Sequence, residues 1–162
     1  MLSPEELEQF HTQGFLFLKD ALTATQLKRL TEQFDLWKEQ SRSQTAAYGE
    51  TIDGRPRFDI EPGHCAERPA LRRIASPVEI SDVYREVVRD NRALDAVVDI
   101  FGPNIKFENA KINSKLPGAA TQVKFHQDFL FEAHTNDDMI TVLFFLDSVT
   151  PAHGTVRLPQ RG

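Results

Sequence analysis

The sequence predicts an α+β fold, with helices first along the chain and an antiparallel sheet after them. Residues 1–103 carry helix-capping patterns and apolar residues spaced three or four apart. Residues 104–162 contain short β-branched and aromatic runs bounded by Gly, Pro, Asn and Asp. Helices followed by strands, rather than alternating βαβ units, indicate helices packed against an antiparallel sheet.

The first elements are a helix and a short strand. Ser3 suits an N-cap, Pro4 the first helical position, and Glu6 can bond back to the cap, so a helix should begin there. It should end before Gly14. Residues 14–18 are short and aromatic, which predicts a strand.

A second helix and a long connection follow. Thr23 and Gln26 repeat the capping-box pattern, and the helix should extend to about Ser41. Its apolar face consists of Leu27, Leu30, Phe34 and Trp37. Repeated Gly and Pro interrupt every periodic pattern in residues 42–77, which predicts a long loop.

A helical pattern resumes after Ser76-Pro77 and stops at Gly102-Pro103. The strand-like runs beyond it are residues 105–107, 111–113, 123–125, 139–146 and 155–158. We expect them to form the sheet on which the helices pack.

Size and charge limit the classes of function. The chain has 162 residues, of which 40% are hydrophobic and 27% charged, as expected for one domain spanning residues 1–162. Its net charge of -5 argues against nucleic acid as a partner. Cys65 is the single cysteine, and neither an apolar signal region nor a membrane-length apolar run is present. We therefore expect a cytoplasmic protein with no membrane partner.

The stretch "KFHQDF" contains a candidate metal site. Residues two apart in a strand share a face, so His126 and Asp128 would converge while Gln127 points away. One imidazole and one carboxylate supply two thirds of the 2-His-1-carboxylate triad that binds non-heme Fe(II). Spacing alone leaves two interpretations open, a metal-binding strand or an ordinary strand with polar substitutions.

Longer segments resemble one family. "KFHQDFLFEAHTNDDMITVLFFLDSVTPAHGTVRLP" resembles the iron-binding region of the phytanoyl-CoA dioxygenase family in its His-Gln-Asp, its apolar strand ending in aspartate and its Thr-Pro turn. "EELEQFHTQGFLFLKDALTATQLKRL" and "RRIASPVEISDVYREVVRDNRALDAVVDIFGPNIKFENAKINSKLPG" resemble the family's opening and middle sections. The resemblance covers nearly the whole chain.

This resemblance implies N-terminal helices on a double-stranded β-helix, the cupin-like jelly roll, with residues 104–162 as its first part. It implies an Fe(II)/2-oxoglutarate-dependent dioxygenase that uses O2 to hydroxylate a small organic substrate, with release of succinate and CO2. His126 and Asp128 would be the catalytic metal ligands. Cosubstrate contacts would come from Arg73, Lys111, Asn113, Gln127, Thr135 and Phe144, each of which has a purely structural alternative, such as a solvated surface arginine for Arg73.

The loop around His134-Thr135-Asn136 would cover the pocket mouth. The family's last iron histidine and its 2-oxoglutarate arginine lie beyond the Thr-Pro turn, where this sequence ends at Gly162. His153 falls in a predicted turn and is not expected to be the third ligand. We therefore expect an incomplete jelly roll, whose exposed strand edges would favour self-association. Alternatives are a non-catalytic binding module and another cupin-type metal enzyme.

Overall fold

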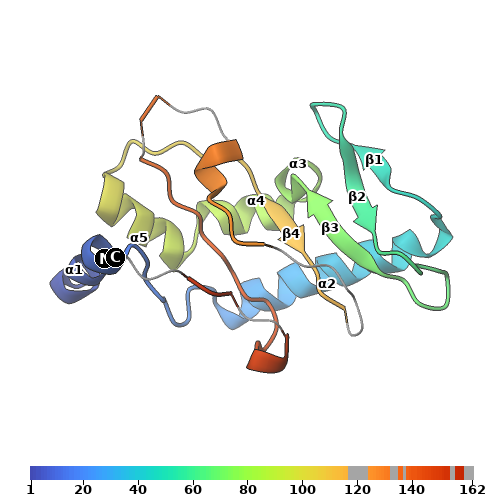
Figure 1. Cartoon of the computed structure of the whole chain (residues 1–162), viewed down its shortest axis with the longest axis horizontal. Coiled ribbons are helices and arrows are strands. Elements are labelled where there is room, and N and C mark those ends of the chain that lie inside the picture. Colours follow the sequence, from blue (N-terminus) through green and yellow to red (C-terminus); the bar gives the residue numbers. More distant parts are fainter. Residues whose placement is uncertain (117–123, 132–134, 137, 154–155, 159–162) are drawn as a thin grey trace. The chain divides into compact units, whose positions relative to one another are not determined.

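A computed structural model describes residues 1–116, 124–131, 135–136, 138–153 and 156–158 (Figure 1). The chain divides into two compact units, each of which is described by itself. The terminal unit comprises Met1–Thr23, Asp90–Lys106 and Val123–Gly162, and the sheet unit comprises Ala24–Arg89 and Phe107–Gln122. Helices and an antiparallel sheet are both present, which confirms the α+β class.

The terminal unit contains two helices: both ends of α1 follow the predicted signals, whereas for α5 only the end before Gly102 was predicted. Helix α1, Pro4–Gln13, has a capping box: Glu6 N donates to Ser3 Oγ at 3.2 Å, and Ser3 N donates to Glu6 Oε2 at 2.8 Å. It stops at Gly14, whose φ of 78° is left-handed and whose N–H bonds to Phe10 O. Helix α5, Arg92–Phe101, begins after Asn91, whose side chain accepts from Leu94 N at 2.9 Å.

The sheet unit contains three helices and four strands. The helices are α2 (Ala24–Gln40), α3 (Pro77–Ile80) and α4 (Asp82–Arg89), and a 3₁₀ turn, Ser41–Ser43, follows α2. The strands are β1 (Tyr48–Glu50), β2 (Pro56–Ile60), β3 (Leu71–Ala75) and β4 (Lys111–Asn113). They pair antiparallel in the order β1-β2-β3-β4, with β1 and β4 at the edges (Figure 1).

One face of the sheet is apolar and packs on helices. Tyr48, Phe58, Ile74 and Ile112 are cross-strand partners in one row, so their side chains share a face. The Trp37 ring of α2 lies 6.0 Å from the Phe58 ring and 5.4 Å from the Tyr84 ring of α4, centroid to centroid. Ile74 is fully buried. Trp37, Phe58 and Tyr84 are buried as well, and the other buried apolar residues of the sheet unit are Leu30, Ala70, Leu71 and Val87.

The predicted long loop at residues 42–77 is wrong, because it carries three of the four strands that the structure describes. Its glycines and prolines lie mostly at turns between strands instead of breaking one continuous pattern. Gly54, with φ 77°, closes the turn between β1 and β2 and donates to Thr51 O at 2.9 Å. Gly63, with φ 84°, lies between β2 and β3.

Several predicted strands are also wrong. Residues 14–18, 105–107 and 139–146 are irregular, as are the described residues 124–125 and 156–158 of two further runs; only 111–113 forms its predicted strand. A β-prone run becomes a strand when a neighbour binds its backbone, and within the described residues no strand pairs with these runs. The jelly roll expected for 104–162 stays a prediction. No helix in the described part of the chain is long and apolar enough to cross a membrane.

Candidate functional site

His126 and Asp128 converge in the terminal unit, although not on a strand. Residues 124–127 are irregular, and a 3₁₀ turn, Asp128–Phe131, begins at the aspartate. The N–H of Leu130 donates to the carbonyl of Gln127 at 3.2 Å, which closes this turn. His126 Nε2 lies 3.1 Å from Asp128 Oδ1. The predicted strand is therefore wrong here, and a turn rather than the strand pleat brings the two side chains together.

Each of the two side chains also makes a second polar contact. His126 Nδ1 lies 2.8 Å from the backbone carbonyl of Lys124. Asp128 Oδ2 accepts a hydrogen bond of 2.9 Å from Thr141 Oγ1. The two side chains are 39% and 37% exposed, so both are partly accessible to solvent.

The donor atoms of this pair suit a divalent metal ion. A neutral imidazole has one N–H, yet both nitrogens of His126 face oxygen acceptors. If Nδ1–H donates to Lys124 O, the Nε2 lone pair faces the Asp128 carboxylate. A second proton on the imidazole, or a cation bound between His126 Nε2 and Asp128 Oδ1, would remove the repulsion between these two electron pairs. Metal-binding histidines commonly donate their outer N–H to a backbone carbonyl, and imidazole plus carboxylate suits non-heme iron.

A complete metal cluster is not seen in the part of the chain that the structure describes. Those residues hold no group of three or more His, Cys, Asp or Glu side chains placed to bind a metal. His153 lies in the 3₁₀ turn Pro151–His153, as its position in a predicted turn indicated, and its Nδ1 accepts from Thr150 N at 3.0 Å. The predicted loop residue His134 lies outside the described residues.

Three of the predicted cosubstrate residues share one face of the sheet unit. Arg73 on β3 and Asn113 on β4 are direct cross-strand partners, so their side chains point to the same side. Lys111 lies two residues before Asn113 and shares that side. Their neighbours Ile74 and Ile112 form the adjacent pair, whose side chains point to the core. Strand pairing thus places Arg73 on the same exposed surface as Lys111 and Asn113, which follow it by 38 and 40 positions in the sequence (111 − 73 = 38 and 113 − 73 = 40).

An aspartate that sequence analysis missed joins this surface. Asp59 on β2 is the cross-strand partner of Arg73, and its Oδ2 lies 3.6 Å from Arg73 Nη2. The same carboxylate oxygen forms an ion pair with Arg72. One carboxylate therefore faces two guanidinium groups, which leaves net positive charge on this surface. Its signal in the sequence is the alternation in "PRFDI", where Asp59 occupies an outward position.

The remaining predicted residues belong to the terminal unit. Gln127 lies between His126 and Asp128 in the sequence and is exposed, and its carbonyl accepts the hydrogen bond of the 3₁₀ turn. Thr135 is exposed and Phe144 is half-buried. Thr141, the partner of Asp128, was not singled out from the sequence. Its signal is a single hydroxyl inside the apolar run "MITVLFFL".

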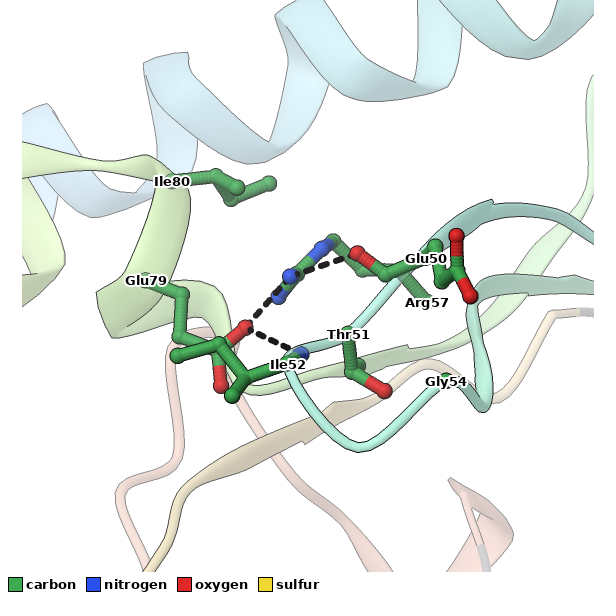
Figure 2. A pocket seen from close by; sticks show the side chains of 7 residues that line it. All are labelled: Glu50, Thr51, Ile52, Gly54, Arg57, Glu79 and Ile80. Carbon is green, nitrogen blue, oxygen red and sulfur yellow. Dashed lines mark hydrogen bonds and ion pairs between the residues drawn. The ribbon is translucent and has the colours of Figure 1, made fainter.

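A depression of about 520 Å³ lies in the sheet unit, and its lining contains none of the residues predicted as functional. Figure 2 shows the Arg57 guanidinium directed at Glu79 and at the Glu50 carbonyl. It is lined by Glu50, Thr51, Ile52, Gly54, Arg57, Glu79 and Ile80. Because its buried cation and its anion already bind each other, we interpret this depression as a structural feature.

Comparison with known proteins identifies the family of this chain. Residues 10–159 match the model of the phytanoyl-CoA dioxygenase family, and the chain belongs to that family. The predicted family is thereby confirmed. One curated relative is the "Probable alpha-ketoglutarate-dependent hypophosphite dioxygenase" of Stutzerimonas stutzeri, 27% identical over 152 residues. Those residues are 94% of this chain and 50% of that protein, so the chain spans about half the relative's length. No solved structure matches significantly.

Proposed function

We propose that this chain provides part of the active site of an Fe(II)/2-oxoglutarate-dependent dioxygenase. One observation carries the proposal: His126 Nε2 and Asp128 Oδ1 lie 3.1 Å apart, and both side chains are partly exposed to solvent. Membership of the phytanoyl-CoA dioxygenase family supports the same conclusion. The iron would be held by His126, Asp128 and a third ligand that the described residues do not supply.

The iron, when bound, supplies activation of O2 coupled to oxidative decarboxylation of 2-oxoglutarate to succinate and CO2. The protein's own residues bind and orient. Arg73 suits one carboxylate of 2-oxoglutarate, because a guanidinium can donate two parallel hydrogen bonds to it. Asn113 and Lys111 can add donors from the same face of the sheet. Gln127, Thr135 and Phe144 would line the pocket beside the metal.

The architecture proposed for this function is one domain over residues 1–162, with the N-terminal helices packed on a cupin-like jelly roll. The antiparallel sheet and its helices are consistent with that architecture. Strands β1 and β4 form the edges of the described sheet, and self-association through such an edge is part of the proposal.

The substrate would be a small molecule. The curated relative's name specifies hypophosphite, which makes hydroxylation of a P–H bond in a small phosphorus oxyanion a second candidate beside hydroxylation of a C–H bond. Supplying each class of substrate and measuring succinate release would separate the two. Metal binding without succinate release would favour another cupin-type metal enzyme, and absence of metal binding would favour a binding module.

The decisive experiment is an anaerobic titration of the protein with Fe(II) in the presence of 2-oxoglutarate, following the visible band of the chelated complex. His126→Ala and Asp128→Ala should each weaken Fe(II) binding by about 100-fold or more, since even loss of an outer partner costs 10- to 100-fold. His11→Ala in the last turn of α1 is the matched control and should leave the affinity unchanged. Equal Fe(II) affinity in all four proteins would refute the metal site.

A further inference from the structure

We infer that Thr141 is a positioning residue of the metal site, an inference that rests on the proposed function. Its hydroxyl donates to Asp128 Oδ2 at 2.9 Å while Asp128 Oδ1 lies 3.1 Å from His126 Nε2. The hydroxyl therefore occupies one carboxylate oxygen and leaves the other directed at the histidine. Thr141 would therefore act on the metal site through Asp128.

A carboxylate needs such a partner to serve as a one-oxygen ligand. The terminal torsion of an aspartate is broad and roughly two-fold, so without a restraint Asp128 can exchange or rotate its two oxygens. A hydrogen bond to Oδ2 removes that freedom before the metal arrives. A neutral hydroxyl suits this role, because a lysine or arginine there would compete with the metal for the carboxylate's charge.

The two ligands are supported in parallel. The Lys124 carbonyl lies 2.8 Å from His126 Nδ1 on the outer side of the imidazole, as Thr141 does on the outer side of the carboxylate. Supporting contacts of this kind orient metal ligands, and their loss typically weakens metal binding 10- to 100-fold. The Lys124 contact uses the backbone, so Thr141 is the contact that a side-chain substitution can remove.

The Thr141 bond differs from the local bonds of helical threonines. Thr31 Oγ1 donates to Leu27 O at 3.0 Å and Thr12 Oγ1 donates to Glu8 O at 2.7 Å, each four residues back in its own helix. Thr141 reaches a side chain 13 residues away in sequence. Its neighbours Val142 and Leu143 are apolar and 42% and 56% exposed. The Thr141 hydroxyl thus donates to the proposed metal ligand Asp128 rather than to a carbonyl of its own backbone segment.

The test measures Mn(II) affinity by loss of the free-ion electron paramagnetic resonance signal, without 2-oxoglutarate or turnover. Thr141→Val keeps the side-chain shape and removes the hydroxyl, and Thr141→Ala removes it independently. Both should bind Mn(II) about 10- to 100-fold more weakly than wild type. Thr141→Ser retains a hydroxyl and should bind close to wild type. Thr31→Val, which loses a local hydroxyl bond in α2, should also leave the affinity unchanged.

His126→Ala separates the two possible failures. If it weakens Mn(II) binding while Thr141→Val and Thr141→Ala match wild type, the inference about Thr141 is wrong and the proposed metal site stands. If the His126→Ala variant binds Mn(II) with the same affinity as wild type, the proposed function itself is wrong. Thermal unfolding of each variant shows that a weakened affinity does not come from loss of the fold. Weak binding by Thr141→Ser as well would also overturn the hydroxyl's role.

Discussion

The guanidinium of Arg57 forms an ion pair with the carboxylate of Glu79 inside the sheet unit (Figure 2). The Arg57 side chain is 5% exposed and the Glu79 side chain 22%. Arg57 Nη1 also donates to the carbonyls of Ala75 and Ser76, at 3.1 and 2.8 Å, and Nη2 donates to the Glu50 carbonyl at 2.8 Å. One side chain therefore ties β2 to the ends of β1 and β3 and to α3.

Replacement of this arginine should be strongly destabilising. Arg57→Ala leaves a largely buried carboxylate without its cation and three carbonyls without their donor, and should cost about 3–5 kcal/mol in the free energy of unfolding. Arg85→Ala is the control, because Arg85 pairs with an Asp82 side chain that is 84% exposed, and it should cost less than about 1 kcal/mol. Urea denaturation measures both. Equal costs would show that Arg57 does not tie the elements together.

The two tyrosines should respond oppositely to loss of their hydroxyls. The Tyr48 hydroxyl is buried with no hydrogen-bond partner in the described structure, whereas the Tyr84 hydroxyl donates to Leu30 O at 3.2 Å. Tyr48→Phe removes an unsatisfied group, so the free energy of unfolding should stay equal or rise. Tyr84→Phe removes a buried bond and should lower it by about 0.5–1.5 kcal/mol. Urea denaturation of both variants would contradict this assignment if Tyr48→Phe were the more destabilising.

Both ends of α1 and the end of α5 could be predicted because their signals are local, whereas the division of residues 77–101 into three helices was not predicted. Ser3 and Glu6 cap α1 within one turn, and Gly14 and Gly102 end α1 and α5 with φ values of 78° and 85°. The strands within residues 42–77 could not be predicted in the same way. Phe58 is a strand residue because Tyr48 and Ile74 flank it and Trp37 covers it, and none of these is its near neighbour in sequence.

In the candidate site, too, features with a local sequence signal were predicted and those set by tertiary contacts were not. His126 and Asp128 were predicted from their spacing and from the family resemblance, but the expected strand is a turn that begins at Asp128. Thr141 and Asp59 were missed, because the first bonds across 13 residues and the second meets Arg73 only through strand pairing. Contacts set by tertiary packing leave little pattern in a single sequence.

The tyrosines also predict a pH dependence. The chain has two tyrosines, and burial raises the pKa of both Tyr48 and Tyr84 above the ordinary value of 10.0. The folded state thus favours the neutral phenols. Their contribution to stability is complete below the pKa of unfolded tyrosine and is lost as pH rises from there through the folded pKa. Stability should therefore fall above about pH 10.

Ultraviolet absorbance of tyrosinate tests this directly. In the folded protein, absorbance should rise only above pH 10.0, together with unfolding seen by circular dichroism. In urea, both phenols should titrate near their ordinary value. A rise of half the full amplitude near pH 10.0 in folded protein would mean that one phenol is solvated, and Tyr48→Phe and Tyr84→Phe would show which.

The final prediction concerns the Arg73 side chain. Because Asp59 is shared with Arg72, we expect Arg73 to retain positive charge with which it could bind one carboxylate of 2-oxoglutarate. Arg73→Met should weaken the binding of 2-oxoglutarate to the Mn(II)-loaded protein about tenfold or more, since hydrogen bonds to charged groups contribute about 1.5–3 kcal/mol. Arg29→Met is the matched control: Arg29 is 42% exposed against 47% for Arg73, and pairs with Glu86 at 2.7 Å. Its 2-oxoglutarate affinity should not change.

Asp59→Asn should change the 2-oxoglutarate affinity in the opposite direction from Arg73→Met. Removing the carboxylate that competes for Arg73 should strengthen 2-oxoglutarate binding, while Mn(II) affinity measured without cosubstrate stays at the wild-type value in every variant. Isothermal titration calorimetry with 2-oxoglutarate measures both the expected loss and the expected gain in affinity. Unchanged affinity in Arg73→Met and in Asp59→Asn would make Arg73 a surface arginine paired with Asp59, and 2-oxoglutarate would then need a different cation. A loss in Arg73→Met with a gain in Asp59→Asn has no explanation in sheet stability alone, because both variants break the same ion pair.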